Sequence, residues 1–137
     1  MRCPKLSNPI DPTPADLRLW AYTPDACYPD EMSQDWDLCV TSFKNAGSIL
    51  QFASDVACPN RDFFLRCLYL LAGDCVRTEG GREDIPKLRA FLLRVPLDAD
   101  RLVRLWVDRT QHLLAHPESF DYELWCCGDF ARNESAA

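Results

Sequence analysis

Apolar residues recur at steps of three and four along most of this chain, which is the period of an α-helix. In the segment 61–78 they cover more than one narrow stripe of the predicted helix, and Gly80-Gly81 then ends it. The apolar residues of this segment are Phe63, Phe64, Cys67, Leu68, Leu70, Leu71, Cys75 and Val76. A helix that is apolar over such a width has neighbours on two sides. We therefore predict that 61–78 is the central helix of the fold.

Shorter helices are predicted on both sides of this segment. Thr13 is a suitable cap for a short helix that follows it. Asp35 is a suitable cap for another, which ends near Gly47 and is followed by a further helix from Ser48. A single bent helix over 35–57 is the alternative to this pair.

After the central helix, three more helices are predicted. Asp84 and Asp98 are placed to begin two of them, and the second runs to about Ala115. Pro96 separates these two helices, because proline cannot continue a helix. A last short helix is predicted over 118–126.

The pattern divides the chain into three parts. Residues 1–13 are predicted to form an irregular arm, because they are rich in proline. Residues 14–128 are predicted to form a single helical domain, and 129–137 a frayed tail. No segment alternates with the period of two that a strand needs, and the linkers are short. We therefore predict an all-α fold, a compact single-domain bundle of five to seven helices with mostly antiparallel neighbours.

The chain is acidic, since its 137 residues include 15 Lys and Arg against 21 Asp and Glu, a net charge of −6. A negative field disfavours nucleic acids and anionic membranes as partners. No apolar run approaches the ~20 residues that span a bilayer, and the first residues lack the hydrophobic core of a signal peptide. We therefore predict a cytoplasmic protein with no nucleic-acid or membrane partner.

Two acid–base pairs, Asp62 with Arg66 and Asp100 with Arg104, have the four-residue spacing of ion pairs within a helix.

The chain contains eight cysteines, and an even count indicates a disulfide framework only in a secreted chain. Cys39, Cys67 and Cys75 lie at helix-periodic apolar positions, where a free cysteine acts as a small hydrophobic residue. We therefore predict that the thiols are mostly reduced. The surroundings of the adjacent Cys126 and Cys127 are acidic, which opposes thiolate formation, so no nucleophile is predicted there.

No motif for catalysis or cofactor binding is present. Paired carboxylates such as Asp98 with Asp100 lie at helix starts, where acids interact favourably with the helix dipole. The two histidines, His112 and His116, are four residues apart and share one face of a predicted helix. The two imidazoles could coordinate one metal ion, but the sequence has neither the HExxH pattern nor further metal ligands at a suitable spacing. We predict no enzymatic activity, no bound metal and no cofactor.

Acidic residues stand beside aromatic residues in two stretches, from Tyr28 to Trp36 and from Phe120 to Trp125. Such surfaces suit the recognition of a basic protein, which the acids steer and the aromatic residues anchor. The candidate partner-binding residues are Asp30, Glu31, Asp35, Trp36, Asp121 and Glu123. We predict a small acidic module that binds a basic protein, such as an immunity-like or inhibitory protein that neutralises its partner. A DNA mimic is a narrower version of the same hypothesis.

Two other classes of function also fit the sequence. A metal-binding protein or hydrolase would use His112, His116 and nearby acids, and metal analysis of the purified protein would reveal it. A structural subunit of a larger assembly would be oligomeric, and light scattering would reveal that.

Overall fold

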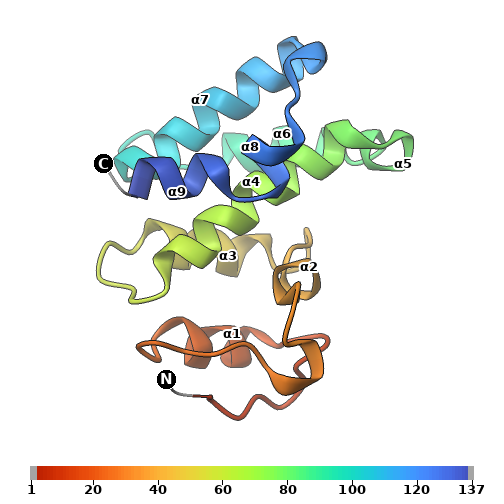
Figure 1. Cartoon of the computed structure of the whole chain (residues 1–137). Helices are drawn as coiled ribbons and strands as arrows, with labels where there is room; N and C mark the ends of the chain where they lie inside the picture. Colours follow the sequence, from red (N-terminus) through yellow and green to blue (C-terminus); the bar gives the residue numbers. More distant parts are fainter. Residues whose placement is uncertain (1–2, 136–137) are drawn as a thin grey trace.

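The structure is a computed structural model that describes the backbone of residues 3–135 and the side chains of residues 3–132. This part of the chain contains nine α-helices, two short 3-10 helices and no β-strand, so the predicted all-α fold is confirmed. The helices are α1 (Pro14–Ala21), η1 (Asp30–Met32), α2 (Trp36–Val40), α3 (Ala46–Ser54), α4 (Arg61–Arg77), α5 (Glu79–Arg82), α6 (Ile85–Leu93), α7 (Arg101–Ala115), η2 (Pro117–Ser119), α8 (Tyr122–Cys126) and α9 (Asp129–Ser135). None of these helices is both long enough and apolar enough to cross a membrane. Figure 1 shows α1 at one end of the molecule, α7 at the other and α4 running between them.

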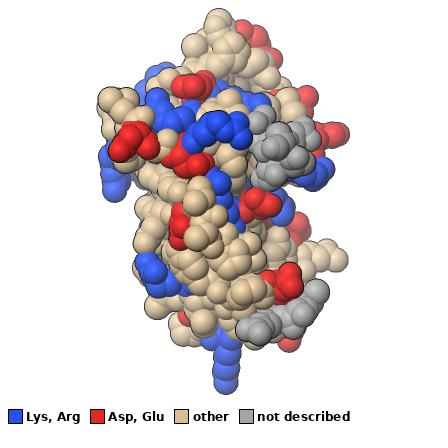
Figure 2. Space-filling view, turned by 90° about the vertical axis from the view of Figure 1, so that its left-hand side faces the viewer, with Lys and Arg blue, Asp and Glu red and all other residues tan. Residues whose placement is uncertain are grey.

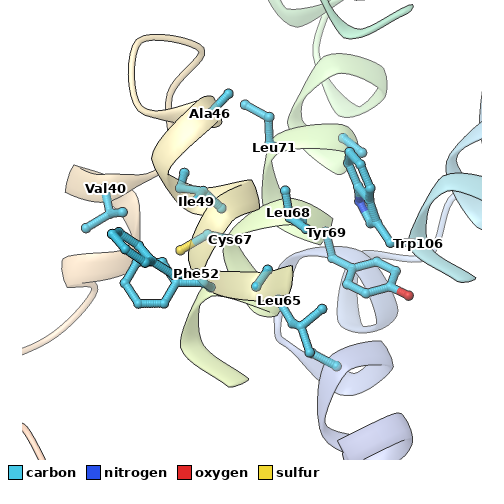
Figure 3. Packing of buried hydrophobic residues seen from close by; sticks show 14 of the residues in the cluster. Val40, Ala46, Ile49, Phe52, Leu65, Cys67, Leu68, Tyr69, Leu71 and Trp106 are labelled. Carbon is cyan, nitrogen blue, oxygen red and sulfur yellow. The ribbon is translucent and has the colours of Figure 1, made fainter. Parts of the chain in front are cut away.

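The helix α4 is the centre of the fold, as its two-sided apolar pattern predicts. Twelve of its 17 residues are buried. Val40, Ile49 and Phe52 lie on one side of it, where α2 and α3 pack (Figure 3). Trp106 of α7 lies on the other side, beyond Leu68. Leu68 and Trp106 are fully buried, so α4 joins the two halves of one continuous core.

The N-terminal arm is fastened to the start of α1. The side chain of Thr13 accepts the N–H of Asp16 at 3.1 Å, and the Asp16 carboxylate accepts the N–H of Thr13 at 3.0 Å, which is a capping box. The same carboxylate accepts the N–H of Ser7 at 2.7 Å. A disulfide between Cys3 and Cys27 joins the arm to the loop after α1, with 5.1 Å between the two Cα atoms.

The segment before α4 forms two helices, with the break earlier than the sequence indicates. The chain leaves helical geometry at Thr41, which is extended, and resumes it only after Asn45. The side-chain amide of Asn45 is buried and donates to the carbonyl of Val40 at 2.9 Å. This bond satisfies a carbonyl at the end of α2 and fixes the break, which the apolar period alone does not reveal.

Two helix starts after α4 also differ from the sequence prediction. The predicted helix over 118–126 is divided into η2 and α8, because Asp121 begins a new helix by accepting the N–H of Leu124 at 3.0 Å. The helix predicted to begin at Asp98 begins later, with Asp100 as its cap. The described residues contain more α-helices than the five to seven expected because α5 and α9 were not predicted, and η1 and η2 add short elements that a 3.6-residue period resolves poorly.

The predicted frayed tail over 129–137 is wrong for its described part, which forms the helix α9. The ring of Phe130 packs against the rings of Tyr69 and Trp125, with centroids 5.2 and 5.3 Å apart. Ala131 is buried in the same cluster. Burial of these two residues stabilises a helix whose own sequence carries little periodicity. The last two residues of the predicted tail lie outside the described residues.

Candidate protein-binding site

The connection from η2 through α8 to α9 forms a hollow of about 640 Å³ on the surface. Three carboxylates line it, those of Asp121, Glu123 and Asp129. Its other described lining residues are Phe120, Tyr122 and Leu124, and none of the six is Lys or Arg. We call this feature the acidic hollow. It joins negative charge to aromatic and aliphatic surface, which is the combination expected from the sequence for this stretch.

Local structure determines which side chains of α8 face outward. Trp125 is 4% exposed and lies against Gly73 of α4, which carries no side chain to keep the two helices apart. With Trp125 turned into the core, Tyr122 is half exposed, at 52%, and Glu123 is exposed as well. The cap bond to Leu124 engages one oxygen of Asp121 and leaves its carboxylate on the surface.

The cations nearest to the acidic hollow already have partners. Arg77 lies over the Tyr122 ring, 5.5 Å from its centroid, and also 3.0 Å from the carboxylate of Asp74. Arg132 donates to Asp129 at 3.0 Å. Within the described part of the chain, no Lys or Arg forms an ion pair with Asp121 or Glu123. These two carboxylates are therefore exposed and without an ionic partner among the described residues.

The second predicted group of acids lies elsewhere on the molecule. Asp30 and Glu31 are exposed on η1 and line a separate hollow of about 370 Å³. Lys5 and the Cys3–Cys27 bridge line the same hollow, so a cation of the protein itself already stands there. Its character is therefore mixed, whereas the described lining of the acidic hollow carries one sign of charge.

Trp36 does not fit the predicted role of a surface anchor, because it is fully buried. Its ring stacks on Phe63 at 5.3 Å between centroids, and its Nε1 donates to the carbonyl of Pro9 at 2.9 Å. Asp35, the residue before it, is exposed and adopts a left-handed backbone with φ of 58°. Trp36 thus anchors the N-terminal arm to the core, and only the acids of this stretch remain available to a partner.

Four members of the acidic hollow were not among the predicted site residues, namely Phe120, Tyr122, Leu124 and Asp129. Asp129 falls in the segment expected to be a frayed tail, so its carboxylate had no expected position. Phe120 and Leu124 are apolar residues that pack against the core yet are only partly buried, so part of each faces the hollow. The available sequence signal was Gly128 itself, because the chain turns there with φ of 81°, a backbone geometry that favours glycine.

The two histidines lie side by side, without a third metal ligand placed beside them among the described residues. Their ring centroids are 4.8 Å apart, and Nδ1 of His116 lies 3.4 Å from the carboxylate of Glu118. Among the described residues, no group of three or more His, Cys, Asp or Glu side chains is placed to hold a metal ion. His112 instead lines a pocket of about 300 Å³ whose floor includes Trp125 and Phe130.

The cysteines are mostly unbridged, as predicted, with Cys3–Cys27 as the exception. Burial, together with the nearby Asp74, raises the pKa of the Cys126 thiol to about 11. Such a thiol is protonated near neutral pH and is a poor nucleophile. Cys126 is therefore not an activated nucleophile.

Charge is not uniform over the rest of the surface. On the face shown in Figure 2, basic and acidic side chains are interspersed over the upper part, and a broad uncharged area lies below them. The net negative charge of the chain therefore does not produce an acidic surface on every face.

Comparison of the chain with known protein families, with curated proteins and with solved structures gave no match.

Proposed function

We propose that this protein is a small binding module that recognises a basic segment of another protein through the acidic hollow. The observation that carries the proposal is the composition of the hollow, whose described lining holds three carboxylates, two aromatic rings and a leucine but no cation. A Lys or Arg side chain would be attracted by Asp121 and Glu123. Its aliphatic stem would lie against Tyr122 and Leu124.

The physical role of the carboxylates is mainly to steer and select the partner. Exposed acids increase the association rate with a basic protein surface, and they repel acidic protein surfaces. Dissolved salt screens both electrostatic effects. The half-exposed ring of Tyr122 supplies the apolar contact that keeps a docked side chain in place. A module of this kind, in the immunity-like or inhibitory class, acts by covering a basic surface of its partner and needs no catalytic group.

We infer a cytoplasmic location for this activity. The six unbridged cysteines support it, because thiols stay reduced in that compartment. The Cys3–Cys27 bridge is the single feature that opposes it.

The test uses a labelled peptide of alternating lysine and tyrosine, added to dilute protein and followed by fluorescence anisotropy. The site variant is Asp121→Lys/Glu123→Lys, and the matched control is Asp30→Lys/Glu31→Lys. Both variants change the net charge equally, so a purely non-specific attraction would fall equally in the two. We expect the site variant to bind at least about tenfold more weakly than the control, and the wild-type affinity to fall with salt.

Circular dichroism should show that both variants fold, and the site variant should have a somewhat lower thermal midpoint, because it loses the cap that Asp121 gives α8, worth about 1 kcal/mol. Equal loss of peptide binding in the two variants would show that the acidic hollow has no special role. Unchanged binding in the site variant would likewise contradict the proposal.

A further inference from the structure

Two leucines at the end of α6 project from the molecule. Leu93 is 87% exposed and Leu97 is 89% exposed, more than any other large apolar side chain in the described part of the chain. The neighbouring Leu92 and Val95 are buried, because they occupy the side of this segment that faces the core. Single exposed apolar residues are ordinary, but Leu93 at the end of α6 and Leu97 in the loop after it give this segment two projecting apolar side chains, an apolar protrusion suited to contact with another protein.

Three arginines surround this protrusion. Arg89 lies one helical turn before Leu93, Arg94 directly follows it, and Arg101 begins α7 shortly after Leu97; all three arginines are exposed. None of them forms an ion pair with a carboxylate of the described residues. The leucine–arginine edge, as we call these five residues, is therefore basic and apolar, with the exposed Asp98 as the acid within it.

The leucine–arginine edge and the acidic hollow lie on different faces. Both α6 and α8 pack on α4, and Figure 1 shows α8 in front of α4 and α6 behind it. An intramolecular contact between the two surfaces is therefore excluded by the helix between them, whereas a contact between two molecules is open.

We propose that the acidic hollow of one molecule binds the leucine–arginine edge of a second copy of this chain. The two surfaces are complementary in charge, since the hollow presents carboxylates without a described cation in its lining and the edge presents arginines without a described ionic partner. Both surfaces also offer apolar contact, since Phe120, Tyr122 and Leu124 line the hollow and two exposed leucines belong to the edge. The proposal rests on the function assigned to the acidic hollow and names its partner.

A contact of this kind is heterologous, because it joins two different surfaces. Each molecule in a pair keeps one unused hollow or edge, so association continues beyond a dimer or closes into a ring. Salt should weaken the association, because the arginines and carboxylates that make the contact are exposed.

The test is sedimentation velocity of the full chain at rising concentration and low salt. We expect the average mass of the wild type to rise beyond that of a dimer and to fall when salt is added. Leu93→Ser/Leu97→Ser and Asp121→Lys/Glu123→Lys should each remain monomeric. An equimolar mixture of the two variants should form a one-to-one pair, because each keeps the surface that the other has lost. The control Leu38→Ser, which changes a leucine that is 57% exposed on α2, should associate like the wild type.

A wild type that stays monomeric at every concentration would overturn this inference, and so would a mixture of the two variants that forms no pair. Either result leaves the binding of the lysine–tyrosine peptide unaffected, so the failure of this inference is distinguishable from the failure of the proposed function. Far-ultraviolet circular dichroism checks that the variants are folded, which the high exposure of the changed residues leads us to expect.

Discussion

Asp16 shows how much of the N-terminal structure depends on one residue. Burial of this carboxyl raises its pKa, but hydrogen bonds from the backbone of Ser7, Thr13 and Asn8 and from the Ser7 hydroxyl outweigh burial and lower the pKa to about 2. The unfolded chain, with a value near 3.8, therefore binds this proton more tightly than the folded protein does. Charged Asp16 thus stabilises the folded state by holding the arm against α1.

We expect this stabilisation to be complete above about pH 4 and to be lost as the pH falls through about 2. Asp16 is buried, so this shift of its pKa corresponds to a stabilisation of about 2 kcal/mol. Asp16→Asn should lose that amount at pH 7 and should depend less steeply on pH than the wild type in the acid range. Urea unfolding over this range measures both quantities, and parallel stability curves for the two proteins would disprove this role.

The thiols give a second prediction at the scale of residues. Burial is the main reason that the pKa of the Cys67 thiol and that of the Cys75 thiol are raised to about 12. Cys127, by contrast, is exposed to solvent. A thiol reagent at pH 8 should modify Cys127 first in the native protein and the two buried thiols only on unfolding. Denatured, unreduced protein should give six free thiols and reduced protein eight. Rapid modification of Cys67 in the folded protein would contradict the buried position assigned to it.

Ion pairs show where sequence reasoning ends at this scale. The spacing of Asp100 and Arg104 predicts a pair within one helix. In the structure the Asp100 carboxylate instead pairs with Arg61 at the start of α4, while it also caps α7. Arg66 likewise reaches Asp37 of α2, at 3.5 Å. Charge spacing along a helix identifies residues that could pair, but the packing of helices decides which partner is nearer.

At the scale of elements, the contact between α4 and α8 determines where the acidic hollow lies. A methyl group on Gly73 would come within 2.9 Å of Cβ of Trp125 and 3.1 Å of Sγ of Cys126. The two helices are therefore as close as a glycine allows. The sequence predicted α4 correctly from its apolar width, but a glycine inside a helix does not reveal which helix it approaches.

Gly73→Ala should destabilise the protein by about 1–3 kcal/mol, because α8 must shift to relieve the overlap with Trp125. The matched control is Gly47→Ala in α3, where an added methyl meets no atom within 4 Å. This control should be neutral or stabilise the protein by up to about 1 kcal/mol, as alanine does in an open helix position. Urea unfolding compares the two. Equal shifts for both variants would show that α8 does not pack closely on Gly73.

At the scale of the whole molecule, charge is distributed so that one recess remains uniformly acidic. Asp121 and Glu123 were predicted as binding residues because acids and aromatic rings are adjacent in the sequence, and they do line one hollow with Tyr122. Trp36 carried the same local signal and is fully buried. Adjacency in sequence therefore locates candidate residues, but the orientation of a tryptophan depends on the neighbouring helices, which the local sequence does not contain.

The central claim is that the acidic hollow binds a basic segment, and nuclear magnetic resonance tests it most directly. Dilute ¹⁵N-labelled protein is titrated with the lysine–tyrosine peptide, and the shifts of its backbone amides are followed. We expect the largest changes to fall between Phe120 and Asp129 and to disappear when salt is added. Largest changes at Asp30 and Glu31, or small changes spread evenly over the chain, would contradict the central claim.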